Sequence, residues 1–340
     1  MTVALPTLDL RDPSTYPTRR AEAWKWSDVR ARLRVAPAPS PEVQIAPGGP
    51  FARLGGVEAA FANGRALGDA VIEAIGTLRL RFVSEADGTG HQASAVVRVP
   101  AGQSLLVLES YEGAGRAYAS NVALRFEVGE GAVLERIVLI EEAEDALAIS
   151  TAEILPAAGA RVFQTTLTRG AGLQRHETRV AHPGLGVTVE LNSVYALAGE
   201  RHADLATVVT HAGLDGVTQQ LTKGVVADRA RGVFQGKIVV LPGADGTDAR
   251  MGHHALILSD RAEVDAKPEL EIFADDVACA HGNTVGALDE DALFYIRARG
   301  VPEDEARALL TEAFLHEALD PIAREDVRET LAARLAAWRG

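Results

Sequence analysis

Residues 122–131, VALRFEVGEG, carry the pattern that decides the fold class of this chain. Apolar side chains occupy every second position from Val122 to Val128, and a glycine turn follows. The same alternation recurs at 187–191, VTVEL. A period of two residues is typical of a β-strand that buries one face. The sequence therefore predicts a mainly β protein whose short strands are separated by glycine turns.

The turn glycines recur with a nearly constant spacing. Four of them precede strand-like runs at intervals of 29, 28 and 27 residues: Gly102, Gly131, Gly159 and Gly186. A period in the twenties with strands in every unit favours a β-solenoid. A β-sandwich, whose strands also recur between turns, remains the alternative on this pattern. A doubly wound α/β sheet is excluded, because it needs crossover helices and no long helical pattern occurs between about residues 93 and 288.

The N-terminal part is predicted to start with a short helix. It covers residues 18–28 and includes Trp24 and Trp26, which we expect to be packing anchors. The proline-rich stretch over 37–50 then predicts a linker or meander, because proline favours extended backbone and turns.

A mixed segment follows this proline-rich stretch. We expect a strand over residues 57–61 that ends at a turn formed by Asn63 and Gly64. Residues 67–80 are predicted to form a helix.

The C-terminal part changes to a helical pattern. Asp289 is predicted to cap a helix over 291–296 that Gly300 ends, and Pro302 suits the first turn of a second helix. The second helix is expected to bury one face, which consists of Ala306, Leu309, Leu310, Ala313 and Phe314. A third is expected to bury Val327, Leu331, Leu335 and Trp338.

Composition restricts the class of protein. The chain has 340 residues, 47% of them apolar, and a net charge of −13. Nucleic-acid binding is not expected, because it needs basic surfaces. The single cysteine excludes an internal disulfide. The N-terminus lacks the pattern of a signal peptide, and no apolar run reaches the length of about 18 residues that a membrane span needs. We therefore expect a cytoplasmic protein that contacts neither nucleic acid nor membrane.

Several catalytic motifs are missing from the sequence. It holds no GxxxxGK[ST] phosphate loop, so we expect no ATP site in this chain. HExxH, CxxC and GxSxG are also absent. These absences leave no basis for zinc-protease, dithiol or hydrolase-elbow chemistry.

One pair of residues suggests metal or cluster binding. Cys279 lies two positions before His281, so both side chains share a face if the segment is extended. The pair suits a soft metal or an iron–sulfur cluster but is incomplete, because such sites take about four ligands. The missing ligands must come from elsewhere, most simply from another chain. The alternative is that Cys279 is a small buried hydrophobic residue.

Other polar residues are expected to have structural roles. His253 and His254 are adjacent, so on a strand one should be internal and hydrogen-bonded while the other is exposed. His202 and His211 are expected at the surface or in turns. The two aspartates at 275–276 are expected to be solvated or to cap a turn.

The C-terminal third narrows these alternatives. Residues 267–314, KPELEIFADDVACAHGNTVGALDEDALFYIRARGVPEDEARALLTEAF, closely resemble the signature of the SufB/SufD family of iron–sulfur cluster assembly proteins. GVFQGKI at 232–238 and MGHHALILS at 251–259 resemble the preceding family segments, and PTRRAEAWKW at 17–26 resembles the family's N-terminal helix. ACAHGNTVG at 278–286 is similar to the form found in the D subunits, so a SufD-type chain is expected.

The resemblance implies an architecture. Members of the family have a right-handed parallel β-helix between helical terminal regions, which favours the solenoid over the sandwich. We expect an N-terminal helical or mixed region at 1–90, the β-helix at 91–287 and a C-terminal helical domain at 288–340.

The resemblance also implies a function without catalysis. SufD-type scaffolds pair with SufB through the β-helices and bind the ATPase SufC through their C-terminal helices. A transient iron–sulfur cluster then forms at the SufB–SufD interface. His281 matches the family's proposed cluster ligand, and Cys279 matches the neighbouring cysteine, whose claim is weaker. Contacts with SufC are expected at Leu293, Phe294, Tyr295 and Arg299. Whether a flavin joins the complex stays open.

Two alternatives remain. In one, the chain is a self-contained homodimer in which two copies of Cys279 and His281 supply four ligands. In the other, it is a carbohydrate-active enzyme, because parallel β-helices often carry polysaccharide lyases or esterases. The clustered carboxylates and the signal peptide typical of those enzymes are not found in the sequence.

Overall fold

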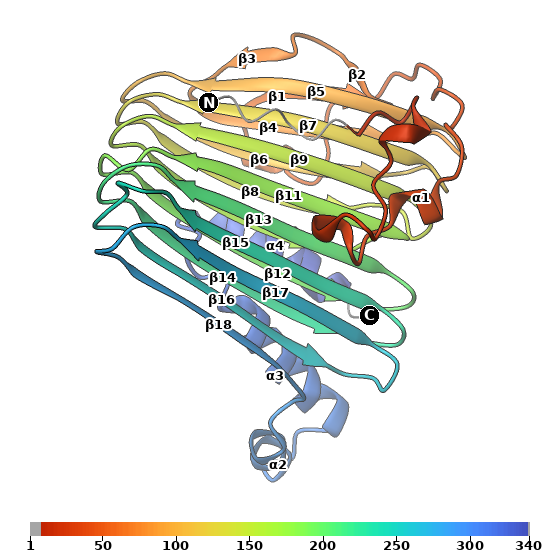
Figure 1. Cartoon of the computed structure of the whole chain (residues 1–340). Helices are drawn as coiled ribbons and strands as arrows, with labels where there is room; N and C mark the ends of the chain where they lie inside the picture. Colours follow the sequence, from red (N-terminus) through yellow and green to blue (C-terminus); the bar gives the residue numbers. More distant parts are fainter. Residues whose placement is uncertain (1–7, 339–340) are drawn as a thin grey trace.

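A computed structural model describes residues 8–338 as two long, parallel sheets that face each other (Figure 1). Residues 1–7 and 339–340, at the outer limits of the expected terminal regions, lie outside the described residues. The first sheet contains, in spatial order, β18 Ala278–Gly286, β16 Asp248–Ile257, β14 Val217–Val226, β12 Thr188–Leu197, β10 Arg161–Thr168, β8 Val133–Glu141, β6 Ser104–Gly113, β4 Gly76–Ser84, β1 Val57–Ala62 and β2 Arg65–Ala66. The second contains β17 Glu263–Ile272, β15 Arg231–Val240, β13 His202–His211, β11 Leu173–His182, β9 Leu147–Pro156, β7 Ala119–Val128, β5 Gly90–Val99 and β3 Val71–Glu73.

The order of the strands confirms the predicted parallel β-solenoid. From β4 onward, successive strands alternate between the two sheets, and each strand pairs in parallel with the strand two further along the chain. The predicted turn glycines confirm the repeat, since Gly102, Gly131, Gly159 and Gly186 all have φ between 63° and 72°. Glycine adopts this left-handed conformation without steric cost.

The space between the sheets is the main core. Alternate side chains from both sheets meet there, and the pattern that opens the sequence is part of it, since Leu124 and Phe126 are fully buried. The core also holds polar groups. The Arg136 guanidinium donates hydrogen bonds of 2.7 and 2.8 Å to Glu109 and one of 2.7 Å to Gln164. Because these groups bond one another, their burial leaves the charge paired.

Three helices follow the strands, and the last two cover the outer face of the first sheet. They are α2 Glu290–Arg297, α3 Glu303–His316 and α4 Glu325–Ala337. Asp289 caps α2 as predicted, and its side chain accepts hydrogen bonds from the backbone of residues 291 and 292. Figure 1 shows α3 and α4 behind the strands and α2 beyond the last strand. The three helices are too short and too polar to span a membrane, and so are the other helices of the described part.

The buried faces of these helices were predicted with mixed success. On α4, Val327, Leu331 and Leu335 are buried as expected. On α3 the expected face is wrong in part, because Leu309 is 48% exposed and Thr311 and Leu315 are buried instead. The buried face of α3 differs from the predicted one because the helix packs against the sheet as well as against its neighbours.

The N-terminal segment lies along the outer face of the second sheet with little helix. The expected helix over 18–28 is reduced to a 3₁₀ turn, Glu22–Trp24, and α1 covers Val29–Arg32; further 3₁₀ turns lie at Pro13–Thr15 and Ala52–Leu54. Side chains of the sheet bind backbone carbonyls of this segment and hold it against the sheet. Gln235 donates to the carbonyl of residue 23, and the imidazole of His202 lies 3.1 Å from the carbonyl of Trp26.

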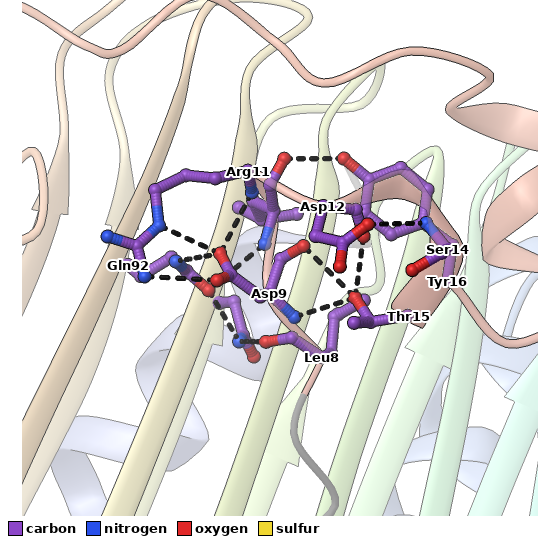
Figure 2. Close-up of polar contacts among 10 residues, drawn as sticks. Leu8, Asp9, Arg11, Asp12, Ser14, Thr15, Tyr16 and Gln92 are labelled. Atoms are coloured by element: carbon purple, nitrogen blue, oxygen red, sulfur yellow. Dashed lines mark hydrogen bonds and ion pairs between the residues drawn. The ribbon is translucent and has the colours of Figure 1, made fainter.

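Polar contacts also fix the beginning of this segment (Figure 2). Gln92 donates to the Asp9 carboxylate at 2.9 Å and accepts from the Leu10 backbone at 3.1 Å. The Tyr16 hydroxyl donates to the Leu10 carbonyl. Apolar side chains of the segment bury themselves beside these contacts, so the N-terminal segment is part of the folded unit.

Residues 57–85 contain the clearest error of the sequence analysis. The predicted strand and its turn at Asn63 and Gly64 are confirmed by β1, which pairs with β2 as a hairpin. The predicted helix over 67–80 is wrong, because β3 and β4 form there. Gly76, at φ 75°, breaks the run, and β4 gains parallel partners on both sides in β1 and β6. The parallel ladder thus begins before residue 91.

Candidate functional site at the open end of the solenoid

The last turn of the solenoid is uncovered within the described residues. β17 and β18 are the edge strands of the two sheets, and each pairs with one neighbour only. Figure 1 shows them at the lower margin of the sheets, with no strand beyond them. The backbone groups on the free side of each strand are therefore available to a partner.

Cys279 and His281 both lie on β18 and share a face, as their spacing predicted. They pair with Ala249 and Met251 of β16, which are buried and point into the core. Because strands in register present the same face, the two candidate ligands are directed toward the solenoid axis. No further turn covers them, so His281 is exposed and Cys279 is half-buried.

The two candidate ligands differ in how ready they are to bind metal. Partial burial and the nearby Asp248 carboxylate raise the pKa of the Cys279 thiol, although a hydrogen bond with the backbone of Ala249 opposes this. A thiol must lose its proton to bind metal, so this environment disfavours Cys279 as a ligand. His281 is exposed, and its imidazole forms no hydrogen bond to any residue of the described part of the chain.

The site is incomplete as a metal centre. No group of three or more His, Cys, Asp or Glu side chains within residues 8–338 is arranged to hold a metal ion. The histidines and aspartates outside β18 do not complete it: His202 and His211 are buried, which corrects their expected surface position, and the aspartates at 275–276 are exposed in the loop before β18.

The two edge strands differ in composition. β17 carries Pro268 and several charges, which are features that prevent pairing with foreign strands; the charged residues are Glu263, Asp265, Lys267, Glu269 and Glu271. β18, ACAHGNTVG, contains neither proline nor a lysine, arginine or carboxylate. Three apolar side chains near the open end are 41–60% exposed: Ile272, Phe273 and Val285. Of the two edges, β18 is the one suited to strand addition.

A second exposed apolar surface follows β18 directly. On α2, Phe294 is 74% exposed and Tyr295 is 60% exposed, and Leu309 of α3 adds to them. The Arg299 guanidinium lies 3.4 Å from the centre of the Tyr295 ring. Leu293, also expected to contact a partner, is buried and supports α2 from within.

The contacts that hold β18 are not evident from the sequence. The imidazole of His253 is buried and lies 2.6 Å from the side-chain oxygen of Asn283. That of His254, on the other face, lies 2.7 Å from the Thr284 hydroxyl. The opposite orientation of the two histidines was predicted from their adjacency. Their common target, β18, was not, because strand pairing is not visible in the sequence.

Comparison with known proteins identifies the family to which a chain with this fold and this free edge strand belongs. Residues 82–314 match the family described as "SUF system FeS cluster assembly, SufBD core domain". The match includes nearly the whole solenoid, α2 and most of α3. The chain therefore belongs to the SufBD family of iron–sulfur cluster assembly proteins.

Individual relatives agree with this assignment. The chain is 34% identical over 205 residues to an iron–sulfur cluster assembly SufBD family protein of Synechocystis, a match that covers 60% of this chain and 45% of the relative. It is 34% identical over 183 residues to the iron–sulfur cluster assembly protein SufD of Escherichia coli, covering 54% of this chain and 43% of that protein. A SufBD family protein of Mycobacterium leprae is 32% identical over 242 residues, 69% of this chain and 61% of the relative. The chain thus spans about half the length of these curated relatives.

Proposed function

We propose that this chain is a non-catalytic SufD-type scaffold that binds a nascent iron–sulfur cluster, as cargo, between β18 and a second protein. The observation that carries this proposal is the pair of His281 and Cys279 on an edge strand whose own sequence contains no proline and no lysine, arginine or carboxylate. Similarity to proteins named SufD supports it. No ATP site is proposed for this chain, and we place the protein in the cytoplasm.

His281 is the principal ligand in this proposal. Its exposed imidazole can bind iron, and mixed Cys and His ligand sets are found in iron–sulfur proteins. Cys279 has a secondary role, because its raised pKa opposes the thiolate form. The remaining ligands come from the partner.

The partner proposed is SufB, which adds a strand to β18. Strand addition satisfies the free backbone groups of an edge, while side-chain contacts give specificity. The exposed Ile272, Phe273 and Val285 lie next to that edge and would be buried by a partner's apolar residues.

The ATPase SufC is proposed to bind α2. Exposed aromatic residues next to an arginine are typical of energetically important contacts, and Phe294, Tyr295 and Arg299 form such a group. ATP binding by SufC would displace α2 and α3 and so act on the adjacent β18 edge.

The test is co-expression with SufB and SufC, followed by measurement of co-purified subunits, iron and acid-labile sulfide. In His281→Ala we expect subunits to associate and cluster content to fall about tenfold or more, because a first ligand is lost. Ala280→Ser, which changes the outward side chain between the two ligands, is the matched control and should keep wild-type content. Phe294→Ala together with Tyr295→Ala should release SufC and retain SufB. Wild-type cluster content in His281→Ala would contradict the ligand role.

A homodimer is the second candidate, because two uncharged β18 edges can pair with each other and bring four ligands together. Sedimentation of the chain alone distinguishes it: a stable dimer that holds iron and sulfide supports the homodimer, whereas a metal-free monomer supports dependence on SufB. Family membership gives no support to the carbohydrate-active alternative.

A further inference from the structure

The two adjacent histidines of β16 act on the same strand from opposite sides. In the parallel register, His253 faces Asn283 and His254 faces Thr284. Because neighbouring residues of a strand point to opposite faces, His253 lies inside the solenoid and His254 outside it. Both histidines thus contact β18 just beyond His281.

The inner contact is built into the core. The side-chain oxygen of Asn283 can only accept, so Nδ1 of His253 donates to it at 2.6 Å. Nε2 of the neutral ring then accepts from the Tyr195 hydroxyl at 2.9 Å. The Phe234 ring is parallel to the imidazole, with centroids 4.8 Å apart. A Cβ at Gly224 would overlap the Tyr195 ring, so glycine is required for this arrangement.

The outer contact extends in the other direction, toward a helix. Nδ1 of His254 lies 2.7 Å from the Thr284 hydroxyl. On the other side, His254 faces Lys223 of β14. The Lys223 ammonium, almost buried, lies 2.6 Å from the Glu317 carboxylate just after α3 and 4.5 Å from the centre of the Phe314 ring. Partial burial and the Lys223 cation lower the pKa of His254, whereas the Glu317 carboxylate raises it.

β18 has few other restraints in the described part of the chain. It pairs with one strand, and most of its side chains are exposed. Within residues 8–338, the only hydrogen bonds of β18 between two side chains are those of Asn283 and Thr284. These two contacts add to the ladder with β16 and to the packing of Cys279 in holding the strand that carries His281.

We propose that His253 and His254 are positioning residues that hold β18, and with it His281, from both faces of the sheet. His254 is also the point at which Lys223 and Glu317 link α3 to that strand. The role of this positioning in cluster binding rests on the proposed function. The contacts of His253 and His254 with β18 do not depend on it.

Hydrogen exchange on the full chain tests the holding of β18. His254→Ala and Thr284→Val each remove the outer bond, and the backbone amides of β18 should then exchange about tenfold faster. Those of β12 and β14 should be unchanged. His254→Asn, which keeps an amide near the Nδ1 position, should restore much of the protection. Arg250→Ala, on the same face of β16, is the control and should leave β18 as in the parent chain.

His253 has variants of the same kind. His253→Asn keeps a donor toward Asn283 and loses the Tyr195 bond, whereas His253→Ala loses both. We expect the hydrogen exchange of β18 to increase moderately in His253→Asn and strongly in His253→Ala. Should His253→Ala fail to fold, Asn283→Leu removes the same bond from the exposed strand. Unchanged β18 exchange in Thr284→Val and Asn283→Leu, or equal acceleration in all strands, overturns the proposal.

The link to α3 has its own signature. NMR titration of His254 should show its pKa raised in Lys223→Met and lowered in Glu317→Gln, because a cation and an anion are removed, respectively. A pKa unchanged in both variants overturns the link. The proposed function and the positioning of β18 by His253 and His254 can fail separately. If His281→Ala keeps its cluster, the proposed function fails while the exchange results stand.

Discussion

The two ends of the solenoid are built differently. At the N-terminal end the chain folds back on itself, so that β2 pairs with the edge of β1 in a hairpin. The Phe61 ring stacks on Phe82 at 5.0 Å, and Phe82 stacks on Tyr111 at 5.2 Å. Asn63 closes the corner through a bond to the carbonyl of residue 41 at 3.0 Å. At the C-terminal end, no hairpin follows β18 within residues 8–338, and of its inward side chains only Cys279 is half-buried while the others are exposed.

The difference shows which end is available for a partner. A solenoid must protect its terminal turns or bind something to them, because each turn buries its apolar face only against a neighbour. The N-terminal end protects itself with a hairpin and aromatic residues. The C-terminal end retains two candidate ligands and an edge strand without charges. Three predictions test this contrast.

Removal of the aromatic cap should have the largest effect. Phe61→Ala creates a cavity at the closed end and is expected to lower the free energy of unfolding by about 3–5 kcal/mol. Val285→Ala, at the open end, is the matched change and should cost less than about 0.5 kcal/mol, because the side chain is already partly exposed. Urea denaturation measures both. Equal losses would show that the open end is as well packed as the closed end.

The pH dependence of stability compares one buried histidine from each end. Burial lowers the pKa of His91, near the closed end, and that of His253, near the open end, to about 4. In the unfolded chain each histidine has a pKa of about 6.5. As the pH falls, it therefore binds a proton before the same histidine does in the folded chain. The contribution of each neutral histidine to the free energy of unfolding is therefore fully present above about pH 6.5. It is lost as the pH falls toward 4, by at most about 3 kcal/mol per histidine.

Urea denaturation between pH 7 and pH 4 checks this expectation. His91→Asn and His253→Asn should each reduce the loss of stability in acid, since each removes one group that must be protonated on unfolding. An unaltered slope in either variant would show that its histidine is not held neutral in the folded chain.

A charge on the free edge should have the smallest effect on the folded chain but a specific effect on association. Val285→Lys is expected to weaken the proposed strand addition by SufB about tenfold, because a lysine on an edge strand opposes pairing. Val71→Lys, on the edge strand β3 at the other end, is the control and should leave association unchanged. Titration calorimetry measures both. Equal weakening by the two changes would place the partner elsewhere.

The sequence predicted the repetitive part of the fold well. Alternation and glycine spacing predicted the strands and turns, because each unit of a solenoid repeats the same local physics. It failed at 67–80 and 18–28, where tertiary contacts override local helical tendency. The segment at 67–80 joins a sheet, and the carbonyls at 18–28 are engaged by Gln235 and His202.

The candidate site was predicted in part. The spacing of Cys279 and His281 correctly placed them on one face of a strand. The sequence did not indicate that His253 and His254 contact this strand, since residues 30 positions apart become neighbours only through the register of β16 and β18. It also misplaced His202 and His211, which are buried. Their hydrogen-bond partners, the Trp26 carbonyl of the N-terminal segment and the Thr218 hydroxyl of β14, come from other elements.

The sequence by itself determined the strand period, the turn positions, the C-terminal helices and the pair of candidate ligands, because these follow from the order of side chains along the chain. The tertiary structure decided which end is closed, which edge is free and which residues hold β18. These features depend on contacts between distant turns, and such contacts are set by strand register and not by local sequence.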